Sequence, residues 1–172
     1  MIYKILAILL DYPTQELSEH WSEIEETLST LKDLEEADKA ALETFIHWAQ
    51  SMPLIKLQTN YVKTFDQSPS NALYLTHHLF EEQDRERGPA LVELAEYYKS
   101  QGFEIDNGEL PDYLPLILEY VSSLEPMDAR LFLQQSAHAS EIIAGNLDKC
   151  ESQYAPLLRI IERHGRLAEL AA

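Results

Sequence analysis

Residues 16–31, ELSEHWSEIEETLSTL, decide the fold class. The large apolar side chains in this stretch recur at intervals of four, three, four and three residues, at Leu17, Trp21, Ile24, Leu28 and Leu31. This spacing puts them on one stripe of an α-helix whose opposite face is rich in Glu and Ser. We therefore expect one amphipathic helix here, with its apolar stripe facing a protein core.

The helical period continues toward the middle of the chain. It predicts a second helix over residues 37–51, ended by Pro53. A third helix is expected to carry Leu54, Leu57, Tyr61 and Phe65.

Residues 66–71, DQSPSN, are rich in side chains that hydrogen-bond their own backbone, so we expect a break there. Ser70 or Asn71 is then expected to cap a helix that begins near Ala72 and runs to about Phe80.

The second half of the chain shows the same pattern. Gly88-Pro89 is expected to open a helix, and Gly102 stands where a left-handed C-terminal cap belongs. Further helices are predicted from Asp112 to a stop at Pro126, and over residues 127–150 and 154–164.

Glycine is scarce, at five residues, and no fixed-period repeat or long linker interrupts the pattern. Since 172 residues suit one domain, we predict an all-α fold, a single domain over residues 1–172 with about seven to nine helices.

The charge balance excludes some classes of partner. Thirteen Lys and Arg oppose thirty Asp and Glu, for a formal net charge of −17, which repels phosphate backbones and anionic membranes. We therefore expect no nucleic-acid binding and no membrane insertion. The lone Cys150 cannot form an internal disulfide, and residues 1–10 lack a signal-peptide cleavage site, so we expect a soluble protein in the cytoplasm.

No cluster of residues predicts a metal site or an active site. His77 with Glu81 and His78 with Glu82 are i, i+4 pairs, but a zinc site needs at least three protein ligands. The nucleophile-elbow, phosphate-loop and dinucleotide-binding motifs are all missing from the sequence. We expect a protein that is not an enzyme and binds no metal.

Tyrosine is used heavily, with nine residues. Such side chains suit a core with a wet edge, and they equally suit an interface. If the tyrosines form an interface, the acid excess predicts an aromatic groove with an acidic rim that binds a basic amphipathic helix.

Residues 108–120, GELPDYLPLILEY, resemble the signature segment of the respiratory nitrate reductase delta subunits, the NarJ-type assembly chaperones of molybdenum enzymes. This family belongs to the wider TorD/DmsD-like group of all-helical redox enzyme maturation chaperones. Further pieces of the family pattern follow in order at residues 10–13 (LDYP), 61–66 (YVKTFD), 84–88 (DRERG) and 151–155 (ESQYA). The resemblance therefore covers about residues 10 to 160.

The resemblance implies a non-enzymatic chaperone that binds the basic N-terminal leader segment of the apo catalytic subunit of a respiratory nitrate reductase. It would assist insertion of molybdopterin guanine dinucleotide into that partner before membrane assembly, without binding the cofactor stably itself. Maturation of another molybdoenzyme reductase and a non-catalytic structural or interaction subunit remain alternatives. The protein is expected to be a monomer or a weak dimer.

The resemblance also implies site residues. Acidic contacts to the leader are expected from Glu109, Asp112 and Glu119, although Asp112 alternatively caps the helix that follows it. The remaining expected groove residues are Tyr61, Phe65, Asp66, Tyr74, His78, Tyr113 and Tyr120. The family commonly has histidine where Tyr113 stands.

Overall fold

The computed structural model describes residues 1–32, 34–81, 84–105 and 108–170, and for 167–170 it describes the backbone alone. These ranges contain ten α-helices, eight of them with seven or more residues, a short π-helix (Val62–Asp66) and a 3-10 helix (Pro69–Asn71), and no strand. The α-helices are α1 (Ile2–Leu10), α2 (Gln15–Glu19), α3 (Trp21–Thr30), α4 (Glu36–Gln50), α5 (Leu54–Tyr61), α6 (Thr76–Leu79), α7 (Arg87–Ser100), α8 (Leu114–Ser122), α9 (Pro126–Lys149) and α10 (Ala155–Leu170). The predicted all-α fold is confirmed.

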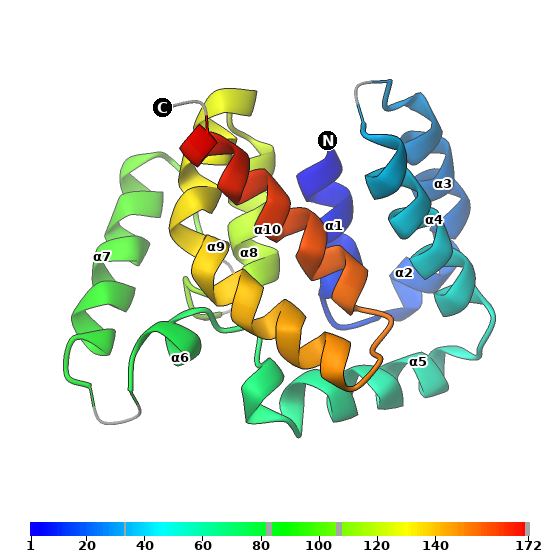
Figure 1. The fold of residues 1–172 in the computed structure, drawn as a ribbon, viewed down its shortest axis with the longest axis horizontal. Helices are drawn as coiled ribbons and strands as arrows, with labels where there is room; N and C mark the ends of the chain where they lie inside the picture. The colour runs from blue at the N-terminus through cyan, green and yellow to red at the C-terminus, as the bar shows by residue number, and fades with distance from the viewer. Residues whose placement is uncertain (33, 82–83, 106–107, 171–172) are drawn as a thin grey trace.

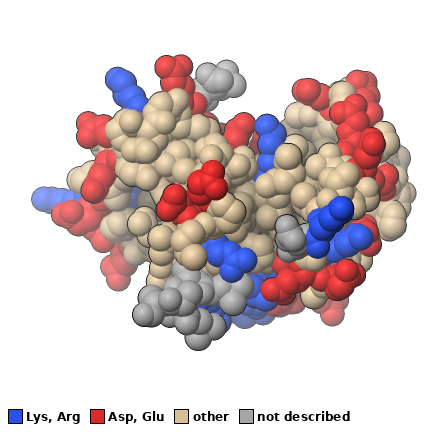
Figure 2. All heavy atoms as spheres, turned by 90° about the horizontal axis from the view of Figure 1, so that it is seen from above, with Lys and Arg blue, Asp and Glu red and all other residues tan. Residues whose placement is uncertain are grey.

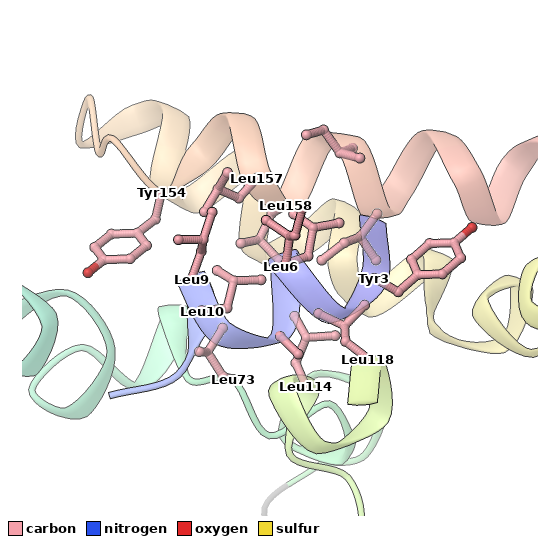
Figure 3. Packing of buried hydrophobic residues seen from close by; sticks show 14 of the residues in the cluster. Tyr3, Leu6, Leu9, Leu10, Leu73, Leu114, Leu118, Tyr154, Leu157 and Leu158 are labelled. Atoms are coloured by element: carbon pink, nitrogen blue, oxygen red, sulfur yellow. The ribbon is translucent and has the colours of Figure 1, made fainter. Parts of the chain in front are cut away.

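Helix α1 is the centre of the core. It lies between α10 on one side and α8 on the other (Figure 3), and one face of it is completely buried through Leu6 and Leu10. The long helices α9 and α10 run antiparallel beside each other across the molecule, while α7 stands at one edge (Figure 1). The amino-acid pattern of residues 1–10 argued against a signal peptide but did not predict this central place.

The expected single helix over residues 17–31 is wrong, because the chain breaks at His20 into α2 and α3. In a continuous helix the carbonyl of Glu16 would accept from the backbone N–H of His20. Here the imidazole Nδ1 of His20 lies 2.7 Å from that carbonyl oxygen, and the backbone N–H turns to Leu17 instead. Leu17, Ile24 and Leu28 are nevertheless buried, so the predicted apolar stripe still faces the core.

The expected helix from Ala72 to Phe80 is also largely wrong, since α6 covers only four residues. Residues 73–75 pair with residues 112–114 through an isolated antiparallel bridge between Tyr74 and Tyr113, held by two backbone bonds. The N–H of Leu114 donates to Leu73 (2.8 Å), and the N–H of Leu75 donates to Asp112 (3.0 Å). Leu73 and Leu75 are buried and Tyr74 between them is half-buried, and Leu75 already has helical dihedral angles as the N-cap of α6.

Two expected helix caps have other partners. The Asn71 side chain donates to the carbonyl of Thr64 (3.0 Å), within the turn that precedes it. The carboxylate of Asp112 accepts from the backbone N–H of Thr76 (3.0 Å), so it caps α6 and not α8. Tyr113 is the N-cap residue of α8, and its side chain makes no capping hydrogen bond.

The remaining helix predictions are confirmed within a few residues. The segment 37–51 corresponds to α4, and the last two predicted helices correspond to α9 and α10. Gly102 ends α7 with φ +76°, the left-handed conformation expected of a C-terminal cap. Within the described ranges, no helix has both the length and the apolar character needed to cross a membrane.

Candidate functional site

The exposed face of α1 is the floor of a groove. On one side, a hollow of about 640 Å³ separates α1 from α2 and α3. On the other side, a hollow of about 460 Å³ separates it from α8 and the connector before α8. Both hollows are lined by Lys4, Ile8 and Asp11, so they form one surface along α1.

A third hollow, of about 450 Å³, extends this surface past the end of α1. It shares Tyr12 with the first hollow and Tyr113 with the second. Aromatic rings line it, among them Tyr61 and Tyr74. We call the three connected hollows the α1 groove.

A chain of hydrogen bonds fixes the tyrosines at the junction of the hollows. Because a carboxylate only accepts, the hydroxyl of Tyr113 donates to Asp11 Oδ1 (3.0 Å). The hydroxyl of Tyr61 lies 2.9 Å from that of Tyr113 and 3.1 Å from the carbonyl oxygen of Leu10. Burial raises the pKa of both phenols, so both keep their protons and act as donors at neutral pH.

Tyr74 is fixed from the opposite side of the same hollow. Its hydroxyl donates to Glu109 Oε1 (3.1 Å), and its ring centroid lies 5.2 Å from that of Tyr113. Burial first, and then the Glu109 carboxylate, raise the pKa of Tyr74 to about 12. The tyrosine rings therefore form a pre-formed wall of the hollow. The neighbouring carboxylates of Asp11 and Glu109 favour a positively charged ligand next to this wall.

Acidic side chains surround the groove on all sides. The lining acids are Asp11, Glu16, Glu23, Asp66, Glu104, Glu109 and Glu119. Lys4 is the one Lys or Arg among the described lining residues. Figure 2 shows one face of the molecule, with many Asp and Glu side chains toward both ends and a few acidic and basic side chains among the other residues between them. An apolar floor with acidic rims is complementary to a basic amphipathic segment.

The groove brings together most of the predicted site residues. Those that line it are Tyr61, Phe65, Asp66, Tyr74, Glu109, Tyr113 and Glu119. The part of the groove that α1, α2 and the turn between them contribute was not predicted, above all Ile8, Tyr12 and Glu16. The LDYP segment at residues 10–13, which resembles the family pattern, could have indicated this part of the groove, because Asp11 and Tyr12 line it.

Three predicted residues lie elsewhere. Tyr120 is 2% exposed and packs among aromatic rings of α7 and α9, with its hydroxyl donating to that of Tyr97 (3.3 Å). Asp112 is 1% exposed and caps α6. His78 is half-buried, and its Nε2 lies 2.7 Å from the carbonyl oxygen of Ala72.

His78 should make stability depend on pH. Burial lowers its pKa below the ordinary value near 6.5, which outweighs the opposite effect of the Ala72 carbonyl. Since the unfolded chain then binds more protons just below pH 6.5, the contribution of His78 is present at neutral pH and is lost as the pH falls. We expect the loss of unfolding free energy between pH 7 and pH 5, measured in urea, to be smaller in His78→Gln.

His20 provides the opposite control. Its exposed imidazole has a raised pKa because of the Glu16 carbonyl and the Glu23 carboxylate, so it stabilises the fold at low pH. His20→Gln should therefore lose more stability on acidification than the wild type. Parallel pH profiles for wild type and His78→Gln would show that this burial has no energetic consequence.

Among the described residues, no group of three or more His, Cys, Asp or Glu side chains is placed to hold a metal ion. The rings of His77 and His78 meet edge to face, with centroids 5.2 Å apart. Glu82, the partner considered for His78, lies outside the described residues.

Fold and site together define an all-helical protein with an acidic, aromatic surface groove. The chain belongs to the nitrate reductase delta subunit family, whose pattern matches residues 13–158.

Named relatives agree with this assignment. The chain is 33% identical over 157 residues, 91% of its length, to the nitrate reductase molybdenum cofactor assembly chaperone NarJ of Escherichia coli K12. It is 31% identical over 163 residues, 92% of its length, to the probable chaperone NarJ of Bacillus subtilis 168. The chain spans 66% of the first relative and 85% of the second. Both relatives are named as assembly chaperones and not as enzymes.

Proposed function

We propose that this protein is a non-enzymatic chaperone of a respiratory nitrate reductase. In this proposal it binds the basic N-terminal leader of the apo catalytic subunit and assists insertion of the molybdenum cofactor into that subunit before membrane assembly. The observation that carries the proposal is the α1 groove, which is lined by seven of the ten expected peptide-binding residues, Tyr113 among them.

The groove has the dimensions for a short helical segment. Helix α1 has nine residues, which at 1.5 Å per residue corresponds to about 13 Å, or two to three turns of a bound helix. Apolar side chains of the leader would lie on Ile8 and Leu116, while its Lys and Arg side chains reach acids on either rim.

Electrostatics supports the proposal in two ways. The net charge of −17 steers a basic peptide toward the protein from a distance, which mainly raises the association rate. Exposed rim carboxylates such as Glu119 then contribute modestly, each by about 0.2–1 kcal/mol. Affinity should therefore depend on both salt and a few named acids.

The test is calorimetric titration of the full chain with a synthetic peptide matching the N-terminus of a nitrate reductase catalytic subunit. We expect saturable one-to-one binding that weakens about tenfold between about 0.05 M and 0.5 M salt, since screening shortens the Debye length over this range. The double variant Glu109→Gln/Glu119→Gln should weaken binding about three- to tenfold at low salt.

The matched control carries the same change in net charge away from the groove. Glu43 on α4 and Glu96 on α7 are both exposed and do not line it. Glu43→Gln/Glu96→Gln should reduce affinity far less than the groove pair. Equal losses in the two double variants would place the peptide elsewhere, and no heat at either salt would contradict leader binding altogether.

The same titration addresses the alternatives. Tighter binding of a leader from another molybdoenzyme reductase would assign the chaperone to that enzyme. Salt-independent self-association without peptide binding, measured by analytical ultracentrifugation, would favour a structural or interaction subunit.

A further inference from the structure

The floor of the α1 groove carries opposite charges at its two ends. Lys4, Ile8 and Asp11 are exposed and line it, and their spacing of four and three residues puts them on one face of the helix. Lys4 and Asp11 are seven positions apart, which at 1.5 Å per residue corresponds to about 10 Å along the groove. The floor therefore runs from a cation, past an apolar side chain, to an anion.

The anionic end is part of the tyrosine network. Asp11 Oδ1 accepts from the hydroxyl of Tyr113 (3.0 Å) and from the backbone N–H of Tyr12 (2.8 Å). Both bonds end on Oδ1, so Oδ2 is available to a cation in the groove. Asp66 lines the hollow beyond this end and adds a second carboxylate. Positive charge on a ligand is therefore favoured at the C-terminal end of α1.

The cationic end consists of Lys4 alone. Its ammonium group forms no ion pair and no hydrogen bond with the described residues, although Lys4 lines one hollow together with Glu23 and the other together with Glu119. Acids stand on both rims of the groove, so they favour a basic ligand without choosing its direction. Lys4 makes the two ends of the floor different.

The dipole of α1 has the same sense as these side chains. A helix carries partial positive charge at its N-terminus and partial negative charge at its C-terminus. Lys4 stands in the first turn of α1, and Asp11 is its C-cap. Figure 3 shows the axis of α1 from Tyr3 to Leu10. A second helix lying along this axis is most favourable when its own dipole is antiparallel to that of α1.

We propose that Lys4 sets the direction of the bound leader, which lies in the α1 groove as a helix antiparallel to α1. The first turn of the leader lies at Asp11 and the tyrosines, and its last bound turn lies over Lys4. This inference rests on the proposed leader binding and adds a requirement on the leader sequence. A Lys or Arg in the first bound turn is followed, about seven positions later, by an acidic or neutral residue. The reverse order puts a cation of the leader on Lys4, which discriminates against it.

Two versions of the leader peptide test the direction by calorimetric titration of the full chain. The bound segment is first located from the peptide residues whose amide NMR shifts change on binding. One version then carries a single Glu in the first turn of that segment, and the other carries it in the last turn. We expect the last-turn version to bind about threefold more tightly, or better, at low salt, as exposed charge pairs contribute modestly. The peptide's own dipole acts the other way, since it favours an acid in the first turn.

Lys4→Glu reverses the charge of the floor without touching the core, because Lys4 is exposed. We expect the preference to reverse, so that the first-turn version binds more tightly. Lys56→Glu on α5 is the matched control, because Lys56 is exposed and does not line the groove. It makes the same change in net charge and should keep the wild-type preference. Urea unfolding of both variants should match that of the wild type.

A nitroxide label on either end of the bound segment reports the direction independently of affinity. The N-terminal label should broaden the amide NMR signals of Tyr12 and Asp66 more than that of Lys4, and the C-terminal label should do the opposite. The proposal is overturned if the two Glu versions bind the wild type equally, if Lys4→Glu keeps the preference as Lys56→Glu does, or if the broadening is reversed. If none of the peptides binds, leader binding itself fails and the direction fails with it.

Discussion

Replacing Asp38 by alanine is expected to lower the free energy of unfolding by about 1–3 kcal/mol, the cost of leaving a buried hydrogen-bonding group without its partner. Asp38 is fully buried in the first turn of α4. Its Oδ2 lies 2.9 Å from His164 Nε2, and its Oδ1 pairs with Arg163. Both partners belong to α10, so this carboxylate ties α4 to α10.

The network continues to the core helix. His164 Nδ1 lies 3.0 Å from the hydroxyl of Tyr3 on α1, and the two rings meet edge to face. Without Asp38, the buried Nε2 of His164 loses its partner, whereas the exposed Arg163 can turn to water. The loss therefore comes mainly from the buried side of the network.

Urea unfolding at pH 7, followed by circular dichroism, measures the effect. Tyr3→Phe removes only one neutral hydrogen bond and should cost about 1 kcal/mol. A loss below 1 kcal/mol in Asp38→Ala would mean that desolvation of the carboxylate cancels its attraction to its partners.

Two glycine-to-alanine substitutions should have opposite effects. Gly165 of α10 faces α9 so closely that an added Cβ would lie 2.8 Å from the carbonyl oxygen of Leu133 and 3.1 Å from the Cβ of Ala137. Backbone cannot move aside without separating the two helices. We expect Gly165→Ala to cost about 1–3 kcal/mol of unfolding free energy, the usual range for overpacking a core.

Gly145 of α9 is the matched control, because a Cβ there would meet nothing within 4 Å. In a helix interior, alanine is favoured over glycine by about 0.5–1 kcal/mol. Gly145→Ala should therefore raise the midpoint of urea unfolding, while Gly165→Ala lowers it. If both variants were stabilised, α9 and α10 would be free to separate at this crossing.

The candidate site could be predicted only in part. Family-like motifs indicated Tyr61, Tyr74 and Tyr113, which the fold does bring to one hollow. They also grouped Asp112 with Glu109 and Glu119, but backbone pairing of residues 112–114 with 73–75 places the Asp112 carboxylate on Thr76 of α6. Asp112 lies in the turn before the Tyr74–Tyr113 bridge, and it does not line the hollow that Tyr113 shares with Tyr61 and Tyr74.

The helical class, most helix positions and the acid excess could be predicted from the amino-acid sequence, because the apolar period, the caps and the charge depend on residues within a few positions of one another. Tertiary structure alone decided that α1 is the core helix and that its outer face lies between acids from distant segments. Tyr113 and Asp11, whose hydrogen bond joins the hollows, are 102 residues apart. Burial of apolar surface brings such distant residues together. Because this driving force is not directional, the packing of the whole fold decides which residues come into contact.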